Sequence, residues 1–158
     1  MAKAQLNTKS IARIAAIQAL YQFENENNDT DIKTILLNII DFYKDNDIKN
    51  DYELEKNSKL KLRPSYNYLS ELVKITHEHL EEIDAIIKQH LTKEWTLDSL
   101  PKLLSATLRV AICEIKYFPE TPSKVILNEY TDIAGDMLDE GEVGFVNSVL
   151  DNYAATNR

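Results

Sequence analysis

The sequence predicts an all-α protein that folds as a single domain. Its 158 residues fall within the usual range of about 100–200 residues per domain. Only three glycines and four prolines are present, too few for a β-sandwich or barrel, which needs a turn about every 8–12 residues. Apolar residues recur every three or four positions, which is the spacing of one helix face. We therefore expect residues 1–158 to form one helical domain.

The first half of the chain predicts three helices and one polar loop. Apolar residues at helical spacing, together with four alanines that favour helix, predict a helix over about 8–23. A second helix follows over about 30–44. The stretch at about 44–63 is rich in Asp, Asn, Lys and Glu, and we interpret it as a solvated loop. Pro64, which suits a first helical turn, begins a long third helix over about 64–91.

The second half predicts three further helices. Leucines and other apolar residues follow a helical pattern over about 100–117. A Thr-Pro pair, typical of an N-cap and first turn, begins a helix over about 121–138. Gly141 and Gly144 separate that helix from a last amphipathic one that includes Tyr153. No segment alternates with period two for long, so no sheet is expected.

The charge is unevenly distributed along the chain. The net charge is −8, and an acidic mean argues against nucleic acid because phosphate-binding domains are usually basic. Residues 24–58 and 129–158 each carry −6, and residues 59–128 carry +1. Residues 1–23 carry +3 and contain no acid. The composition excludes a broadly basic nucleic-acid-binding protein but leaves one small basic edge at the N-terminus.

Histidine and cysteine spacing does not predict a metal site. Of His77, His79 and His90, the first two are only two positions apart and would point to different faces of a helix. Cys113 is the single cysteine, so it completes neither a disulfide nor a Cys-based zinc site. All three glycines lie within 135–144, which leaves no glycine-rich phosphate loop. We expect no metal, no cofactor and no catalytic residue.

The compartment follows from the same composition. A lone cysteine suits a reducing environment, and the N-terminus lacks the apolar core of about 7–15 residues that a signal peptide needs. No apolar run is long enough to cross a membrane. We therefore expect a cytoplasmic protein without membrane contact.

The first predicted helix combines cations with an aromatic residue. Lys3, Lys9 and Arg13 precede Tyr21, and Arg13 lies within about 80° of Tyr21 around the helix. Cations of this kind bind phosphates, and an exposed ring stacks on a base. The alternative is a slightly basic helix whose Tyr21 belongs to the core. Composition alone favours that alternative.

Four groups of residues along the chain form a recognisable set of motifs. They are Arg13-Ile-Ala-Ala-Ile-Gln-Ala-Leu-Tyr-Gln22, Leu108-Arg-Val-Ala-Ile-Cys-Glu-Ile115, the pair Pro122-Ser-Lys-Val-Ile-Leu-Asn-Glu-Tyr130 and Gly144-Phe-Val-Asn-Ser-Val-Leu-Asp151, and Trp95 with Leu97-Asp98-Ser-Leu100. In order and spacing these segments resemble the NusB family of bacterial transcription antitermination factors. The resemblance covers nearly the whole chain outside 44–63.

The resemblance implies a function and a set of site residues. Such proteins are non-enzymatic, all-α domains of two packed helical bundles. They bind the boxA RNA element of ribosomal RNA leader transcripts with NusE, a small-subunit ribosomal protein, and join the RNA polymerase elongation complex to suppress premature termination. Carried over to this chain, Lys9 and Arg13 would contact phosphates, and Tyr21 and Phe145 would meet bases. Asp98 is the best-matched acidic contact for NusE.

This sequence departs from the family pattern at two places. Ser10 and Ile11 stand where the family often has basic residues. Asp139-Glu140-Gly141-Glu142 lies before Phe145, where Lys or Arg is common. Because phosphate contacts supply most of the sequence-independent affinity, we expect the isolated protein to bind RNA weakly and to depend strongly on NusE.

Alternative roles remain open for several residues. Arg109 beside Glu114 would orient helices through a charge-assisted hydrogen bond, and Asn128, Glu129 and Asn147 would cap or brace neighbouring helices. Two other functions also remain open. One is an RNA-binding accessory domain related to those of ribosomal RNA cytosine methyltransferases, and the other is a helical adaptor whose acidic faces bind only a basic protein partner.

Overall fold

The computed structural model describes residues 7–26, 29–54, 63–92 and 95–158. These residues form seven α-helices and one short 3-10 helix, with no strand among them. The helices are α1 (Thr8–Asn25), α2 (Ile32–Leu54), α3 (Tyr66–Glu78), α4 (Leu80–Gln89), α5 (Lys102–Tyr117), α6 (Ser123–Met137) and α7 (Glu140–Asn157), and η1 (Leu97–Ser99) precedes α5. The predicted all-α class is confirmed.

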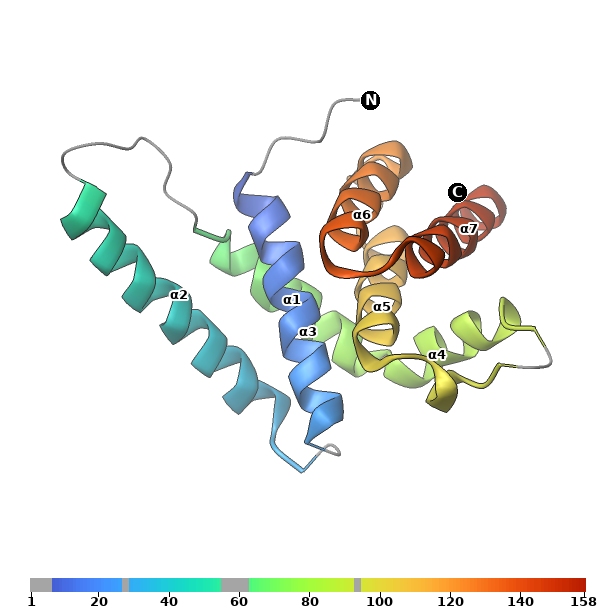
Figure 1. The fold of residues 1–158 in the computed structure, drawn as a ribbon, viewed down its shortest axis with the longest axis horizontal. Coiled ribbons are helices and arrows are strands. Elements are labelled where there is room, and N and C mark those ends of the chain that lie inside the picture. Colours follow the sequence, from blue (N-terminus) through green and yellow to red (C-terminus); the bar gives the residue numbers. More distant parts are fainter. Residues whose placement is uncertain (1–6, 27–28, 55–62, 93–94) are drawn as a thin grey trace.

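Helix α5 lies at the centre of the arrangement. It contacts α1 and α3 on one side, and α4, α6 and α7 on the other. Every residue from Leu104 to Ile115 is buried, so α5 has no solvent face over three turns. Helices α1, α2 and α3 pack together as one bundle, and α4 to α7 form a second around α5 (Figure 1). Helix α2 lies at the outer edge and contacts only α1 and α3 among the closely packed helix pairs.

The predicted loop at 44–63 is wrong over its first part. Helix α2 continues to Leu54, although Leu36 is the last buried apolar residue in the part of the helix, residues 32–46, whose side chains the structure describes. Lys, Glu, Asp and Asn cost at most about 0.7 kcal/mol each relative to Ala in a helix, and no Gly or Pro stands in this stretch to interrupt one. Polar composition was therefore a poor sign of loop structure. The rest of the predicted loop, residues 55–62, lies outside the described residues.

The predicted helix over 64–91 is two helices that meet at His79. His79 has φ −111° and ψ 25°, and it ends α3 and precedes α4. Its ring stacks on Tyr117 of α5, with the ring centroids 4.3 Å apart. The Tyr117 hydroxyl in turn donates to Glu82 on α4 at 2.7 Å. The break between α3 and α4 thus coincides with contacts to α5. The sequence of residues 64–91 alone does not contain this information.

The two glycines predicted to precede the last helix lie inside it. Helix α7 begins at Glu140, and Asp139 is its N-cap, accepting a hydrogen bond from the Glu142 backbone nitrogen at 2.8 Å. The Glu142 side chain accepts from the Asp139 backbone nitrogen at 3.2 Å, which completes a capping box. The reciprocal cap starts the helix at Glu140, before both glycines, whereas the prediction placed its start after Gly144.

The dependence on α5 can be tested with two leucines. Leu108 on α5 is fully buried, whereas Leu37 on α2 is 60% exposed. Leu108→Ala is expected to lower the free energy of unfolding by about 2–5 kcal/mol, because it leaves a cavity between the bundles. Leu37→Ala makes the same chemical change at the surface and should cost less than about 0.5 kcal/mol. Urea denaturation measures both, and equal losses would contradict the central position of α5.

Candidate functional site

The first turn of α1 carries an exposed cation. The Asn7 side chain caps the helix by accepting from the Ser10 backbone nitrogen at 2.8 Å. Lys9 is exposed, and its Nζ lies 5.0 Å from the ring centroid of Tyr68 on α3. An ammonium over an aromatic face is attracted by the ring quadrupole. Lys9 therefore presents a positive charge at this end of α1 in a partly defined position.

Arg13, predicted to contact phosphate, is buried instead. Its side chain is 2% exposed, and Nε donates to both carboxylate oxygens of Glu114 at 2.9 and 3.0 Å. Nη2 donates to Glu114 at 2.7 Å, and Nη1 lies 3.0 Å from a carboxylate oxygen of Glu129. The predicted phosphate contact is therefore not supported. The spacing that placed Arg13 near the face of Tyr21 gave no sign that two acids from other helices hold its guanidinium.

Glu114 on α5 collects donors from three other helices. Besides Arg13, the hydroxyls of Tyr68 and Tyr130 donate to its carboxylate at 2.8 and 2.7 Å. Glu114 is fully buried, and a buried carboxylate is tolerated only when it is paired and hydrogen-bonded. Ser10 extends the same set by donating to a second acid, Glu129 on α6, at 2.8 Å. We call Ser10, Arg13, Tyr68, Glu114, Glu129 and Tyr130 the buried network.

The buried network shifts the ionisation of its members. Burial raises the pKa of Tyr68 to about 12, and the negative charge of Glu114 adds to this increase. Burial also raises the pKa of Tyr130 well above its usual value. For Arg13 burial alone would lower the pKa, but the hydrogen bond and charge of Glu114 raise it overall. At neutral pH the network therefore contains a cationic Arg13 and two neutral phenols.

Arg109 and Glu114 orient helices through charge-assisted hydrogen bonds, as predicted, but they bond to side chains of other helices and not to each other. Arg109 donates through Nε to Asp84 on α4 at 2.7 Å and through Nη1 to Glu24 on α1 at 2.7 Å. Burial lowers the pKa of Arg109, but the hydrogen bond with Asp84 and the nearby acids raise it overall. Residues five apart on a helix point in different directions, which is why each of the two charges pairs with other helices.

Of Asn128, Glu129 and Asn147, which were also predicted to cap or brace helices, two do so. Glu129 joins α6 to α1 through Arg13 and Ser10. Asn147 joins α7 to α6 by accepting from the Thr131 hydroxyl at 2.7 Å. Asn128 is exposed on α6.

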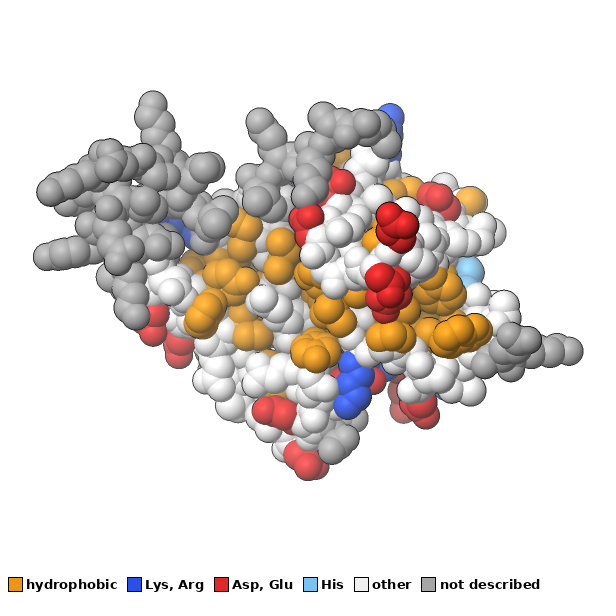
Figure 2. All heavy atoms as spheres, viewed as in Figure 1, with side chains coloured by type: hydrophobic (Ala, Val, Ile, Leu, Met, Phe, Trp, Pro, Cys, Tyr) orange, Lys and Arg blue, Asp and Glu red, His pale blue; other side chains and the backbone are white. Residues whose placement is uncertain are grey.

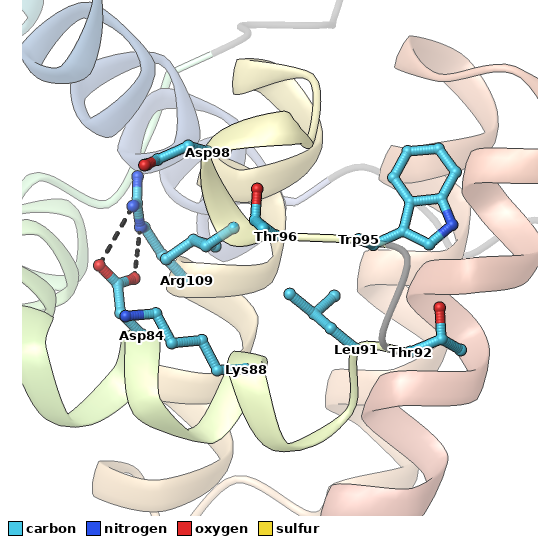
Figure 3. Close-up of a pocket in the computed structure, with 9 residues that line it drawn as sticks. Asp84, Lys88, Leu91, Thr92, Trp95, Thr96, Asp98 and Arg109 are labelled. Carbon is cyan, nitrogen blue, oxygen red and sulfur yellow. Dashed lines mark hydrogen bonds and ion pairs between the residues drawn. The ribbon is translucent and has the colours of Figure 1, made fainter.

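Asp98 is exposed on η1, beside a hollow of about 550 Å³. The hollow lies between α4 and the segment before α5, and Lys88 also lines it. In Figure 3 the Asp98 carboxylate lies near the end of Arg109, whose dashed bonds go to Asp84. Thr96 holds η1 through a capping box with Ser99. The acidic side chain of Asp98 is thus accessible on a short element with a defined geometry.

The two aromatic residues predicted to meet bases lie on different helices. Tyr21 is 39% exposed in the last turns of α1, about 18 Å along the helix axis from Lys9. Phe145 is half-buried in α7 and lines a groove of about 490 Å³ with Trp95. Lys9 and Tyr21 therefore lie toward opposite ends of α1, and Phe145 lies on another helix, α7. Trp95 is the larger exposed aromatic side chain here, at 52%.

Comparison with known proteins decides the family. The sequence signature of the NusB family matches residues 10–155. The chain belongs to the NusB family. Transcription antitermination protein NusB of Rickettsia rickettsii is 49% identical over 154 residues, which cover 98% of this chain and 96% of that protein. The protein of the same name from Rickettsia bellii is 45% identical over 158 residues, covering 100% of this chain and 97% of that protein.

Solved structures of the NusB family share this fold. T. maritima NusB superposes with a TM-score of 0.72 at 26% identity, covering 95% of this chain and 93% of that one. A chain from the crystal structure of the antitermination factors NusB and NusE in complex with dsRNA gives a TM-score of 0.70 at 22% identity, covering 93% and 96%. The arrangement of helices is therefore that of NusB.

Sequence reasoning missed most of the buried network in this NusB-family chain. Glu114 and Glu129 stood in two family segments, but nothing local connected them to Arg13. Nothing in the local sequence marks Tyr68 or Tyr130 as a hydrogen-bond donor to a buried acid. One signal was available: an acid flanked by apolar residues on a helix without polar neighbours, as at Glu114, is rarely buried unless it has a partner.

The structure also locates the groups considered for metal binding. Among the described residues, no cluster of three or more His, Cys, Asp or Glu side chains could hold a metal ion. Cys113 is buried, which raises its pKa to about 12, so it remains a thiol. Within the described part of the chain, no helix is both long and apolar enough to cross a membrane.

The structural role of Arg13 gives a first test of the site. Arg13→Ala is expected to lower the free energy of unfolding by about 3–5 kcal/mol, because it leaves Glu114 and Glu129 as unpaired buried charges. Lys9→Ala, four residues away and exposed, should change it by less than about 0.5 kcal/mol. Urea denaturation at pH 7 measures both. A stable Arg13→Ala protein would contradict the buried network.

The tyrosines give a second test, at alkaline pH. The folded-state pKa of Tyr68 lies above the usual 10.0, so the folded protein keeps the phenol neutral where the unfolded chain ionises it. The contribution of Tyr68 to stability is complete below pH 10 and is lost as the pH rises through about 12. Tyr68→Phe combined with Tyr130→Phe should make this alkaline decline shallower, as measured by urea denaturation from pH 8 to 12. If the free energy of unfolding declines equally steeply with pH in the double variant, the two tyrosines do not cause the alkaline decline.

Proposed function

We propose that this protein is a transcription antitermination factor that binds boxA-type RNA of ribosomal RNA leader transcripts together with NusE. The complex helps the RNA polymerase elongation complex resist premature termination. The observation that carries the proposal is identity of 49% to a protein named for antitermination, over nearly the full length of both chains. The protein acts by binding and not by catalysis, and it works in the cytoplasm, where the nascent transcript is made.

The RNA-binding edge consists of Lys9, Tyr21 and Phe145. Lys9 and Tyr21 are exposed on α1, and Phe145 keeps part of its ring accessible on α7. Lys9 supplies a phosphate contact, and the two rings stack on unpaired bases. Arg13 supports this edge from within, because its bonds to Glu114 and Glu129 join the N-terminal half of α1 to α5 and α6.

NusE supplies the positive charge that this chain lacks. With the guanidinium of Arg13 occupied, one of the three cations of residues 1–23 is unavailable for phosphate. Each phosphate contact contributes a slope of about 0.7 to the salt dependence on single strands. The chain alone therefore binds RNA weakly, and a basic partner that contacts Asp98 brings the remaining phosphate contacts.

A helical adaptor that binds only protein is the second candidate. Its support is the charge of −6 in residues 129–158, which include all of α7. Such a surface attracts a basic protein and repels nucleic acid. Both candidate functions predict that the protein binds NusE. Only the antitermination factor is also expected to bind RNA.

RNA binding by the complex tests the proposal. Labelled boxA RNA is titrated with the complex of this protein and NusE, and with the protein alone. We expect Tyr21→Ala to weaken binding about tenfold, because base stacking on one aromatic ring is worth about 1–3 kcal/mol. Lys9→Ala should weaken binding less and reduce the salt slope by about 0.7.

The matched control for this titration is Lys33→Ala. Lys33 is an exposed lysine on α2, a helix that carries none of the residues of the proposed RNA-binding edge. Its loss should leave RNA affinity unchanged. If RNA affinity is unchanged in both Tyr21→Ala and Lys9→Ala, these residues are not part of the RNA-binding edge. A complex that holds NusE but never binds RNA would favour the adaptor.

A further inference from the structure

Arg158, the residue after α7, is bonded to the turn between α5 and α6. Its guanidinium donates through Nε to the backbone oxygen of Ile115 at 2.9 Å and through Nη2 to that of Phe118 at 2.8 Å. Nη1 donates to the backbone oxygen of Thr121 and to the Ser123 hydroxyl. One side chain therefore joins the end of α7 to the end of α5 and the start of α6.

The sequence of the turn explains why an outside donor is needed. Inside a helix, the backbone oxygen of one residue accepts from the nitrogen four positions later. For Ile115 that position is Pro119, which has no N–H to donate. Ile115 is buried, and a buried carbonyl without a donor is destabilising. Nε of Arg158 supplies the donor that the proline lacks.

The turn that Arg158 holds is one wall of a hollow at the start of α1. The hollow has a volume of about 380 Å³. Glu120, Thr121 and Pro122 line it from the turn, and Lys9 lines it from α1. The bonds of Arg158 therefore fix a surface that lies in the same hollow as an exposed cation of another helix.

Tyr68 connects the turn to Lys9 by a second route. Its hydroxyl oxygen lies 3.4 Å from that of Thr121, and its ring centroid lies 5.0 Å from Nζ of Lys9. A displaced turn would thus change both the wall of the hollow and the aromatic face that attracts the ammonium. The position of Lys9 depends in this way on Arg158.

Cations are scarce around this hollow. Figure 2 shows that acidic side chains predominate over basic ones on the face that carries α6 and α7. Arg13 also lines the hollow, but Glu114 and Glu129 hold its guanidinium. Lys9 has no ion pair with an acid among the described residues. RNA affinity therefore depends on where this one ammonium is held.

We infer that Arg158 is a positioning residue for RNA binding: it fixes the α5–α6 turn and, through the turn, holds the Lys9 ammonium where it meets a phosphate. The inference rests on the proposed function, in which Lys9 supplies a phosphate contact. Four of the five N–H groups of Arg158 are used inside the protein. Lysine cannot replace it, because a single ammonium does not reach acceptors spread over residues 115–123.

The position of Lys9 is tested first without RNA. Protons held over an aromatic face resonate upfield, so the methylene next to Nζ of Lys9 reports its place on the Tyr68 ring in an NMR spectrum. Arg158→Lys should move this resonance toward that of a free lysine. Lys116→Ala is the control, because Lys116 is exposed in the last turn of α5 and bonds to Glu82. A resonance that is the same in Arg158→Lys and wild type contradicts the inference.

RNA affinity is then measured with labelled boxA RNA and the complex of this protein with NusE. Arg158→Ala should weaken RNA binding about two- to fivefold, a loss typical of modest coupling between neighbouring residues. Arg158→Lys keeps the positive charge and should weaken binding equally, because it loses the bonds to the turn. Lys116→Ala removes a positive charge at the same end of α5 and should leave RNA affinity unchanged.

A double-mutant cycle separates positioning from direct contact with RNA. If Arg158 acts through Lys9, Arg158→Ala should have no further effect on RNA affinity in a protein that already carries Lys9→Ala. If the two losses add and Arg158→Lys binds RNA like wild type, Arg158 is itself a phosphate contact and the inference is wrong.

Stability is measured separately, so that a purely structural role of Arg158 is recognised. All affinities are taken at a temperature at which circular dichroism shows each variant to be folded. If Arg158→Ala and Arg158→Lys lower the unfolding temperature but bind RNA like wild type, the inference is wrong and the proposed function stands. If the wild-type complex binds no boxA RNA, the proposed function fails and the inference fails with it.

Discussion

The carboxylate of Glu114 is the interaction on which the rest of this structure depends. It lies in the last turn of α5 and is fully buried, so water does not solvate its charge. A bare carboxylate there would cost several kcal/mol, so the fold brings it donors from α1, α3 and α6. Three helices are thereby oriented by one side chain. Apolar packing fills the two bundles, but the buried network specifies how they face one another.

The same interaction limits which cations remain for function. Arg13 stands at the basic end of the chain, yet its charge neutralises two acids inside the protein. Arg109 is likewise held by Asp84 and Glu24. The number of cations counted along a sequence is therefore larger than the number that a ligand can contact. An acidic protein that binds RNA with so few available cations works best when a second protein carries the positive surface.

Much of the fold could be predicted from the sequence, because helical periodicity reports burial directly. Helix α1 and the helices that follow each proline begin near their expected positions. The failures occur where tertiary contacts decide: His79 ends α3 because its ring stacks on Tyr117, and Arg13 is buried because Glu114 and Glu129 approach it from 101 and 116 residues away. The groove beside Trp95 was also missed, since α7 and the segment before α5 meet only in the folded chain.

Trp95 has a spectroscopic consequence. It is the only tryptophan in the chain and is about half exposed. Fluorescence excited at the indole band therefore reports on this one groove and not on the interior around α5. A folded sample should emit at the long wavelengths of a solvated indole, and unfolding should shift that emission little. A partner that covers the ring would shift it to shorter wavelengths, which makes the native protein its own fluorescent reporter of docking.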